Sequence, residues 1–324
     1  MKLIRKIFGA SKKAHKSTQN PKIERNMEHN TSNIIKNPEE ELKKLNDKGI
    51  ELYNKGQYNE AIKFYDKALK INPNLAQALN NKGNALRNIG NHKVAIKYFD
   101  KAISLNANYH EPWTNKGATY YDIKQYDKAI SCYNNALKID PSNVMALSNK
   151  GAALANSGDY DNAIITFDKA LEINPNDNNT KINKNKLVEK IVADSAEKGY
   201  EKLLQGKYNE SMKYYDKVLD LDPDNINAIT AKGSLLFFNK KYDKAVEIFD
   251  KGLIIYPNDS ILWFNKGEAL ETMGSLAAAI ECFNKTITIS SKRRTNEKVD
   301  QNVDITNKEL IIDARGHINK IKNL

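Results

Sequence analysis

The chain has 324 residues, and its 40% hydrophobic and 28% charged residues and net charge of +11 are typical of a soluble protein. No apolar run approaches the roughly 18 residues that a bilayer-spanning helix needs, so a transmembrane helix is excluded. With only two cysteines, Cys132 and Cys282, a disulfide framework is excluded as well, and we expect both to be small buried side chains.

The positive charge is concentrated at the N-terminal end. Residues 1–36 hold nine lysines and arginines against two acidic residues, a net charge of +7. We expect residues 1–41 to form a basic, disordered tail that is solvated. Weak contact with an anionic membrane or with nucleic acid through residues 1–36 is the alternative. Four apolar residues of the tail would share one helical face at a membrane surface: Leu3, Ile4, Ile7 and Phe8.

From residue 42 onward the sequence repeats with a period of 34 residues, and seven units can be aligned. Position 8 is always glycine: Gly49, Gly83, Gly117, Gly151, Gly199, Gly233 and Gly267. Position 20 is small: Ala61, Ala95, Ala129, Ala163, Ser211, Ala245 and Ala279. Position 24 is aromatic: Tyr65, Phe99, Tyr133, Phe167, Tyr215, Phe249 and Phe283.

Each unit contains two apolar helical patterns separated by a break, which predicts an antiparallel helical hairpin. Glycine within a helix costs about 1 kcal/mol relative to alanine. Its recurrence at position 8 therefore indicates that the two helices touch there, with the aromatic ring of position 24 filling the remaining space.

This pattern resembles the tetratricopeptide repeat. The third unit carries the family residues most completely: Trp113, Gly117, Tyr120, Ala129, Tyr133 and Pro141. The resemblance covers residues 42–177 (units 1–4) and 192–293 (units 5–7). It implies an all-α fold, a right-handed superhelical α-solenoid of stacked helix-turn-helix hairpins, with a concave surface lined by the first helices.

Two further segments lie beside the seven units. We expect residues 178–191 to be helical and to extend the first helix of unit 5 toward the N-terminus. Within residues 294–324 we expect a polar linker at 294–303 and then a helix, because Thr306 and Glu309 have capping-box spacing. This helix is expected to cap unit 7, with binding of another protein as the alternative.

Position 7 is leucine in the family but lysine in every unit here: Lys48, Lys82, Lys116, Lys150, Lys198, Lys232 and Lys266. Position 25 is aspartate in five units: Asp66, Asp100, Asp168, Asp216 and Asp250. We interpret the lysines as structural, with packed aliphatic stems and with the aspartates as candidate partners. A cationic row that binds an acidic ligand is the alternative.

The resemblance places position 6 on the concave surface, and four units carry asparagine there: Asn81, Asn115, Asn149 and Asn265. An asparagine amide both donates and accepts hydrogen bonds, so such a row can hold the main chain of an extended peptide. A solvated polar face is the alternative. Asn84 and Asn115 also match the asparagines of the clamp with which some relatives hold chaperone tails, but the clamp's cations are missing here.

The corresponding surface of units 5–7 is apolar. It comprises Tyr200, Leu203, Leu204, Phe237, Phe238, Ile261 and Phe264. If exposed, this strip would suit an amphipathic helix or an apolar peptide. Packing between neighbouring first helices, which would cover several of these side chains, is the alternative.

The sequence contains no nucleotide-binding, metalloprotease or serine-hydrolase motif. We therefore predict a non-enzymatic, cytoplasmic scaffold that binds a peptide or helical segment of another protein in its concave groove. We expect no cofactor, no metal and no small-molecule substrate. An adaptor that uses the basic tail at a membrane surface or on nucleic acid is the alternative, and an enzyme or enzyme subunit is the competing class.

Overall fold

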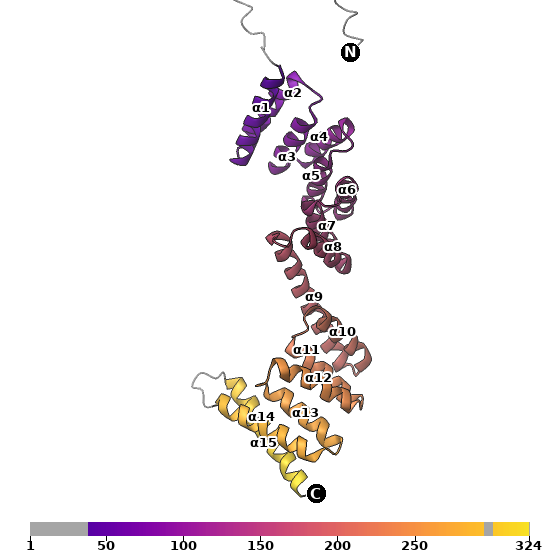
Figure 1. The fold of residues 1–324 in the computed structure, drawn as a ribbon, viewed down its shortest axis with the longest axis vertical. Helices are drawn as coiled ribbons and strands as arrows, with labels where there is room; N and C mark the ends of the chain where they lie inside the picture. Colours follow the sequence, from indigo (N-terminus) through magenta and orange to yellow (C-terminus); the bar gives the residue numbers. More distant parts are fainter. Residues whose placement is uncertain (1–37, 295–300, 324) are drawn as a thin grey trace, which may run out of the picture. The chain divides into compact units, whose positions relative to one another are not determined.

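The computed structural model describes residues 38–294 and 301–323, and all regular elements within them are α-helices (Figure 1). The chain divides into two compact parts, which are called unit 1 (Met1–Ile123) and unit 2 (Lys124–Leu324) from here on; the seven 34-residue units of the sequence are called repeats. Unit 1 contains α1 (Pro38–Asn54), α2 (Tyr58–Ile71), α3 (Ala76–Asn88), α4 (His92–Leu105) and α5 (His110–Asp122). The predicted tail lies outside the described residues except for 38–41, which form the first turn of α1.

Unit 2 contains the other ten described helices. They are α6 (Tyr126–Ile139), α7 (Val144–Ser157), α8 (Tyr160–Ile173), α9 (Asn178–Leu204), α10 (Tyr208–Leu221), α11 (Ile226–Phe238), α12 (Tyr242–Ile255), α13 (Ser260–Thr272), α14 (Leu276–Arg294) and α15 (Gln301–Lys322). Within each unit, successive helices pack against one another as hairpins and as neighbouring hairpins.

Short polar side chains fix where the first helices of several hairpins begin. In each case a side-chain oxygen accepts a hydrogen bond, 2.8 to 3.0 Å long, from the main-chain N–H three residues further on. The capping residues are Asn143 before α7, Asp177 before α9, Asn225 before α11 and Asp259 before α13. Such caps satisfy N–H groups that the helix itself leaves open.

The two helices of a hairpin touch where glycine meets an aromatic ring, which confirms the prediction from positions 8 and 24. The fully buried ring of Phe99 on α4 lies against Gly83 of α3, and a Cβ atom at Gly83 would lie 2.6 Å from Phe99 Cε1. The same contact joins Gly49 to Tyr65, Gly151 to Phe167, Gly233 to Phe249 and Gly267 to Phe283.

The hairpin of α9 and α10 is looser at this point. A Cβ atom at Gly199 would lie 3.1 Å from the ring of Tyr215. Ser211 takes the place of alanine at position 20, and its hydroxyl donates a hydrogen bond of 2.7 Å to the Gly199 carbonyl. A buried hydroxyl therefore supplies part of the contact that tight packing supplies in the other hairpins.

Helix α9 is one continuous helix whose N-terminal half packs against α8 and whose C-terminal half packs against α10 (Figure 1). Its N-terminal half contains Lys184, which pairs with Asp168 at the same spacing of 16 residues as the lysine–aspartate pairs between regular repeats. Leu187 and Ile191 of this half pack in one buried cluster with Phe167 of α8. The C-terminal half packs against α10 as the first helix of a hairpin. Residues 178–191 thus occupy the place of a further first helix at the regular period.

The position 7 lysines join successive repeats. Four of them pair with the aspartate at position 25 of the preceding repeat, and the pairs are Lys82–Asp66, Lys116–Asp100, Lys232–Asp216 and Lys266–Asp250. The structural interpretation of the lysine row is confirmed at these four positions. Lys150 forms no ion pair with a described residue, and burial, with a smaller contribution from Lys169, lowers its pKa.

Helix α15 packs along α14 and covers the last hairpin (Figure 1). Ala314, Ile318 and Ile321 of α15 are buried in one cluster with Ala279 and Phe283 of α14. The helix begins at Gln301, so residues 301–303 of the expected linker are helical, and Thr306 lies inside the helix.

Glu271 of α13 holds α15 through two of its side chains. His317 Nδ1 lies 2.5 Å from one carboxylate oxygen, and Lys320 Nζ lies 3.0 Å from the other. Burial raises the pKa of Glu271, but the hydrogen bonds from Lys320 and His317 outweigh it, so its pKa lies below the ordinary 4.5. Burial raises the pKa of Glu268, one turn earlier, above this value, and His317 opposes this rise only in part.

These two glutamates are expected to act in opposite directions on the docking of α15. The contribution of Glu271 is present above pH 4.5 and is lost as the pH falls through its lowered pKa, so Glu271→Gln should speed hydrogen exchange in α15 at pH 7. The raised pKa of Glu268 means that its ionisation opposes docking, so Glu268→Gln should slow the same exchange. Equal exchange rates in the two variants would contradict this assignment.

Candidate functional site

Two of the asparagines predicted to face a ligand instead join neighbouring first helices. Asn81 Nδ2 donates to Asn46 Oδ1 at 3.1 Å, and Asn115 Nδ2 donates to Asn80 Oδ1 at 2.9 Å. Asn46 and Asn80 are buried and occupy position 5 of the preceding repeat. The sequence reading missed these two residues, although their spacing of 34 residues could have revealed them.

A second row of contacts runs along the same helices of unit 1. Asn88 Nδ2 donates to the Tyr53 hydroxyl at 2.8 Å, and Arg87 Nε lies 2.6 Å from a carboxylate oxygen of Asp122. Asn84, one turn before Asn88, is half-buried on α3. The first helices of unit 1 therefore use much of their polar surface on one another.

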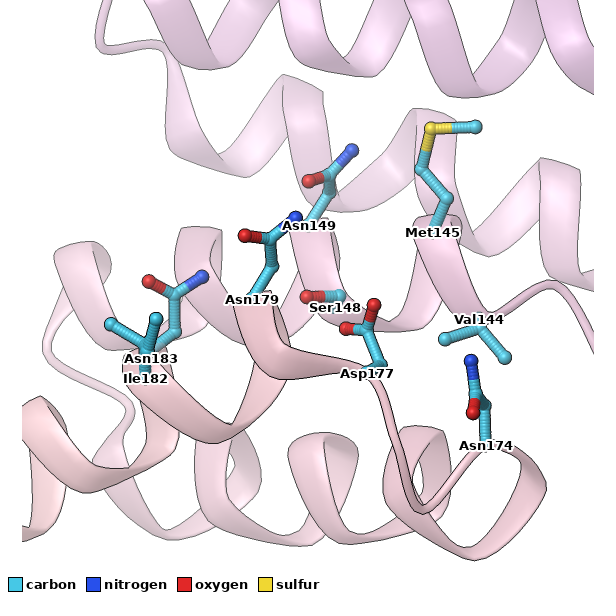
Figure 2. Close-up of a pocket in the computed structure, with 9 residues that line it drawn as sticks. All are labelled: Val144, Met145, Ser148, Asn149, Asn174, Asp177, Asn179, Ile182 and Asn183. Atoms are coloured by element: carbon cyan, nitrogen blue, oxygen red, sulfur yellow. The ribbon is translucent and has the colours of Figure 1, made fainter.

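A cleft of about 550 Å³ lies between α7 and α9 of unit 2 (Figure 2). Its walls are α7, the loop that leads into α9, and the first turns of α9. The residues that line it are Val144, Met145, Ser148, Asn149, Asn174, Asp177, Asn179, Ile182 and Asn183. Of the predicted groove asparagines, the structure brings Asn149 into this cleft together with three asparagines that the sequence reading did not single out.

Three amides in this cleft differ from those of unit 1. The side chains of Asn149, Asn179 and Asn183 form no hydrogen bond with a residue in the described part of the chain. For Asn183 the cause is visible at position 5, where Ser148 stands 35 residues before Asn183, just as Asn80 stands 35 residues before Asn115. The serine side chain is shorter than asparagine and forms no hydrogen bond with Asn183, so the Asn183 amide remains open to a ligand, as do those of Asn149 and Asn179.

Besides these amides, the cleft is lined by two aliphatic side chains and by a carboxylate that is already hydrogen-bonded. Met145 on α7 and Ile182 on α9 are 57% and 51% exposed. The carboxylate of Asp177 accepts hydrogen bonds from the main-chain N–H and the hydroxyl of Thr180. The cleft therefore presents amides between two aliphatic side chains, which suits an uncharged main chain that carries an apolar side chain.

Only part of the predicted apolar strip is exposed in the structure. Tyr200, Leu204, Phe238 and Ile261 are exposed. Leu203 packs in the cluster around Tyr215, and Phe237 packs edge to face against Tyr242 at 5.3 Å. The ring of Phe264 lies 5.7 Å from that of His317, so α15 covers it. Asn265 beside it is half-buried.

The described residues also allow statements about the cysteines, about metal ligands and about helices that could cross a membrane. Both cysteines are buried, and burial raises the pKa of Cys282 to about 11. The described residues contain no group of His, Cys, Asp and Glu side chains that could hold a metal ion. None of the described helices is long and apolar enough to cross a bilayer. The predicted contacts of residues 1–36 with membrane or nucleic acid fall outside the described residues.

Family profiles of the tetratricopeptide repeat match along most of the repeat array. The matched residues are 49–90, 76–109, 110–143, 144–177, 202–265 and 261–293. Together they cover about two thirds of the chain. The comparison with curated proteins found no match.

Several solved structures are similar. A tetratricopeptide repeat protein from Parabacteroides merdae is 19% identical, with 85% of this chain and 99% of that chain covered and a TM-score of 0.40. PilF of Pseudomonas aeruginosa is 19% identical, with 69% and 96% covered and a TM-score of 0.45. YrrB, described as having an unusual peptide-binding site, is 21% identical, with 61% and 95% covered and a TM-score of 0.35. From its matched repeats and its stacked helical hairpins, the chain belongs to the tetratricopeptide-repeat family.

Proposed function

We propose that this protein is a non-enzymatic interaction scaffold that holds an extended segment of another protein in the cleft between α7 and α9. The observation that carries the proposal is the state of the asparagine amides. The amides of Asn81 and Asn115 donate hydrogen bonds to asparagines of the preceding repeat. The amides of Asn149, Asn179 and Asn183 line the cleft and form no hydrogen bond with a described residue.

The chemistry of the cleft defines the segment. Amides pair with the main-chain N–H and C=O groups of an extended chain regardless of its sequence. Met145 and Ile182 flank these amides, so one aliphatic side chain of the segment would lie between them. The ligand is therefore an uncharged stretch of extended chain with at least one aliphatic residue.

The test is selection of random 12-residue peptides displayed on phage against the full chain, followed by fluorescence anisotropy of the selected peptides. The double variant Asn149→Ala/Asn183→Ala should bind them about tenfold or more weakly. Each lost hydrogen bond is worth about 0.5 to 1.5 kcal/mol, and about 1.4 kcal/mol corresponds to a factor of ten.

The matched control is the double variant Asn81→Ala/Asn115→Ala. It removes two asparagines at the same repeat position, but they bond to Asn46 and Asn80. This control should lower the stability of unit 1 and leave peptide affinity within about twofold. Selected peptides that bind the Asn149→Ala/Asn183→Ala variant at full affinity would contradict the proposed site.

A further inference from the structure

A second surface lies on unit 2 at the turns that follow α9 and α11. We name it the aromatic patch and define it by Tyr200, Leu204, Tyr208 and Phe238. All four side chains are exposed, Leu204 to 70% and Phe238 to 56%. None of them lines the cleft between α7 and α9, so this surface stands on observations independent of the proposed function.

The patch is continuous across two successive hairpins. The rings of Tyr208 and Phe238 stack with centroids 5.8 Å apart and planes 14° apart. Phe238 occupies position 13 of its repeat, and the bond from Asn88 to Tyr53 shows that position 13 lies against position 12 of the preceding repeat. The equivalent positions in this pair of repeats are Phe238 and Leu203, and Leu204 beside Leu203 is exposed on α9.

Positive charge borders the patch. The two turns carry Lys207, Lys240 and Lys241, which are exposed and form no ion pair within residues 38–294 and 301–323. Neither turn itself contains an acidic residue, but Glu201 and Glu210 flank the first turn and Asp243 follows the second. Glu210 pairs with Lys202 at 3.8 Å, and Glu201 accepts a hydrogen bond from the Gln205 amide. Lys207, Lys240 and Lys241 are therefore cations at the border of the patch that no acid in the described part of the chain neutralises.

One of these lysines is held at a conformational cost. Lys240 has a φ of 58°, in the left-handed region where five other hairpin turns place glycine, such as Gly90 at 80°. A side chain in this region costs roughly 1 kcal/mol. Glycine would be more stable at this turn, and a positive charge is present there instead; Lys124 shares this conformation in another turn.

We propose that the aromatic patch binds an acidic amphipathic helix of a partner protein. Apolar residues one turn apart on that helix would cover Leu204, Tyr208 and Phe238, and its flanking carboxylates would face the turn lysines. A helix fits better than an extended chain because it satisfies its own main-chain groups, and the patch offers rings and aliphatic groups rather than a row of amides.

The probe is a fluorescein-labelled 16-residue helical peptide with leucines at i, i+3, i+4 and i+7 and glutamates on both flanks. A second peptide carries lysine in place of every glutamate. Anisotropy titrations use the full chain at about 50 mM and 300 mM salt. The acidic peptide should bind at least tenfold more tightly than the basic one, and the difference should shrink at the higher salt. Phe238→Ala should weaken its binding at least tenfold.

Lys240→Gly separates binding from folding. It removes both the charge and the strain, so it should raise the urea midpoint while it weakens binding of the acidic peptide several-fold. The control is Lys124→Gly, because Lys124 has a φ of 59° in the turn between α5 and α6, away from the patch in the sequence. This control should raise the urea midpoint similarly and leave binding unchanged.

Equal affinity for the two peptides, or no saturable binding of the acidic one, would overturn the proposal. So would equal effects of Lys240→Gly and Lys124→Gly on binding. Sedimentation with anionic vesicles that is abolished by Phe238→Ala, without peptide binding, would reassign the patch to a membrane surface. The Asn149→Ala/Asn183→Ala variant should bind the acidic peptide normally, so this test is independent of the cleft.

Discussion

Replacing Phe99 with alanine is expected to lower the free energy of unfolding of unit 1 by about 3 to 5 kcal/mol. The ring is fully buried between α3 and α4 in one cluster with Leu86 and Ala95. Its loss removes apolar surface from the core and leaves a cavity beside Gly83, which has no side chain to fill it. Urea unfolding followed by circular dichroism measures the change.

The same ring should reverse the effect of Gly83→Ala. In the native background the new Cβ would lie 2.6 Å from Phe99 Cε1, so the ring or the helix must shift, at a cost of about 1 to 3 kcal/mol. In the Phe99→Ala background the obstacle is gone, and alanine should stabilise α3 by about 1 kcal/mol. A double-mutant cycle reports this reversal of sign.

Gly316→Ala is the control for helix propensity. Gly316 lies on the exposed side of α15, and a Cβ atom there would meet nothing within 4 Å. The variant should be more stable by about 1 kcal/mol. Additive effects of Gly83→Ala and Phe99→Ala would show that glycine is present at position 8 for a reason other than close approach.

The repeat contacts could be predicted because each depends on one position within a fixed period. Glycine within a helix has a local cost, so its recurrence required a compensating contact, and Phe99 and its equivalents supply it. The continuity of α9 across residues 178–204 is of the same kind, since its apolar residues follow one helical face.

The candidate binding sites could not be predicted in the same way. Whether a side chain is free to bind a ligand depends on which side chains of the neighbouring repeat it contacts, and the sequence of a single repeat does not contain this information. Asn115 and Asn149 look equivalent in the sequence, yet Asn115 meets Asn80 and Asn149 faces a cleft. Likewise Phe237 and Phe238 are adjacent in the chain, but the first packs against Tyr242 and the second is exposed. The packing partner decides the role in each case.

Ile318→Asp is expected to release α15 from the last hairpin. Ile318 is only 8% exposed and packs in one cluster with Phe283 and Ala279, so an aspartate there would be a buried charge without a partner. The matched control is Ile312→Asp on the same helix. Ile312 is 67% exposed, and its replacement should change stability by no more than about 0.5 kcal/mol.

The stability lost through Ile318→Asp cannot exceed the free energy with which α15 docks on the last hairpin. The reason is that the helix can detach and leave the aspartate in water. Hydrogen exchange should therefore accelerate throughout α15 and in the part of α14 that it covers, while α3 and α4 of unit 1 keep their protection. A global loss of protection in Ile318→Asp, or equal exchange in both variants, would contradict the role of α15 as a cap. Because each repeat in such an array contacts only its neighbours, the position of the damage along the chain distinguishes a terminal cap from a central core element.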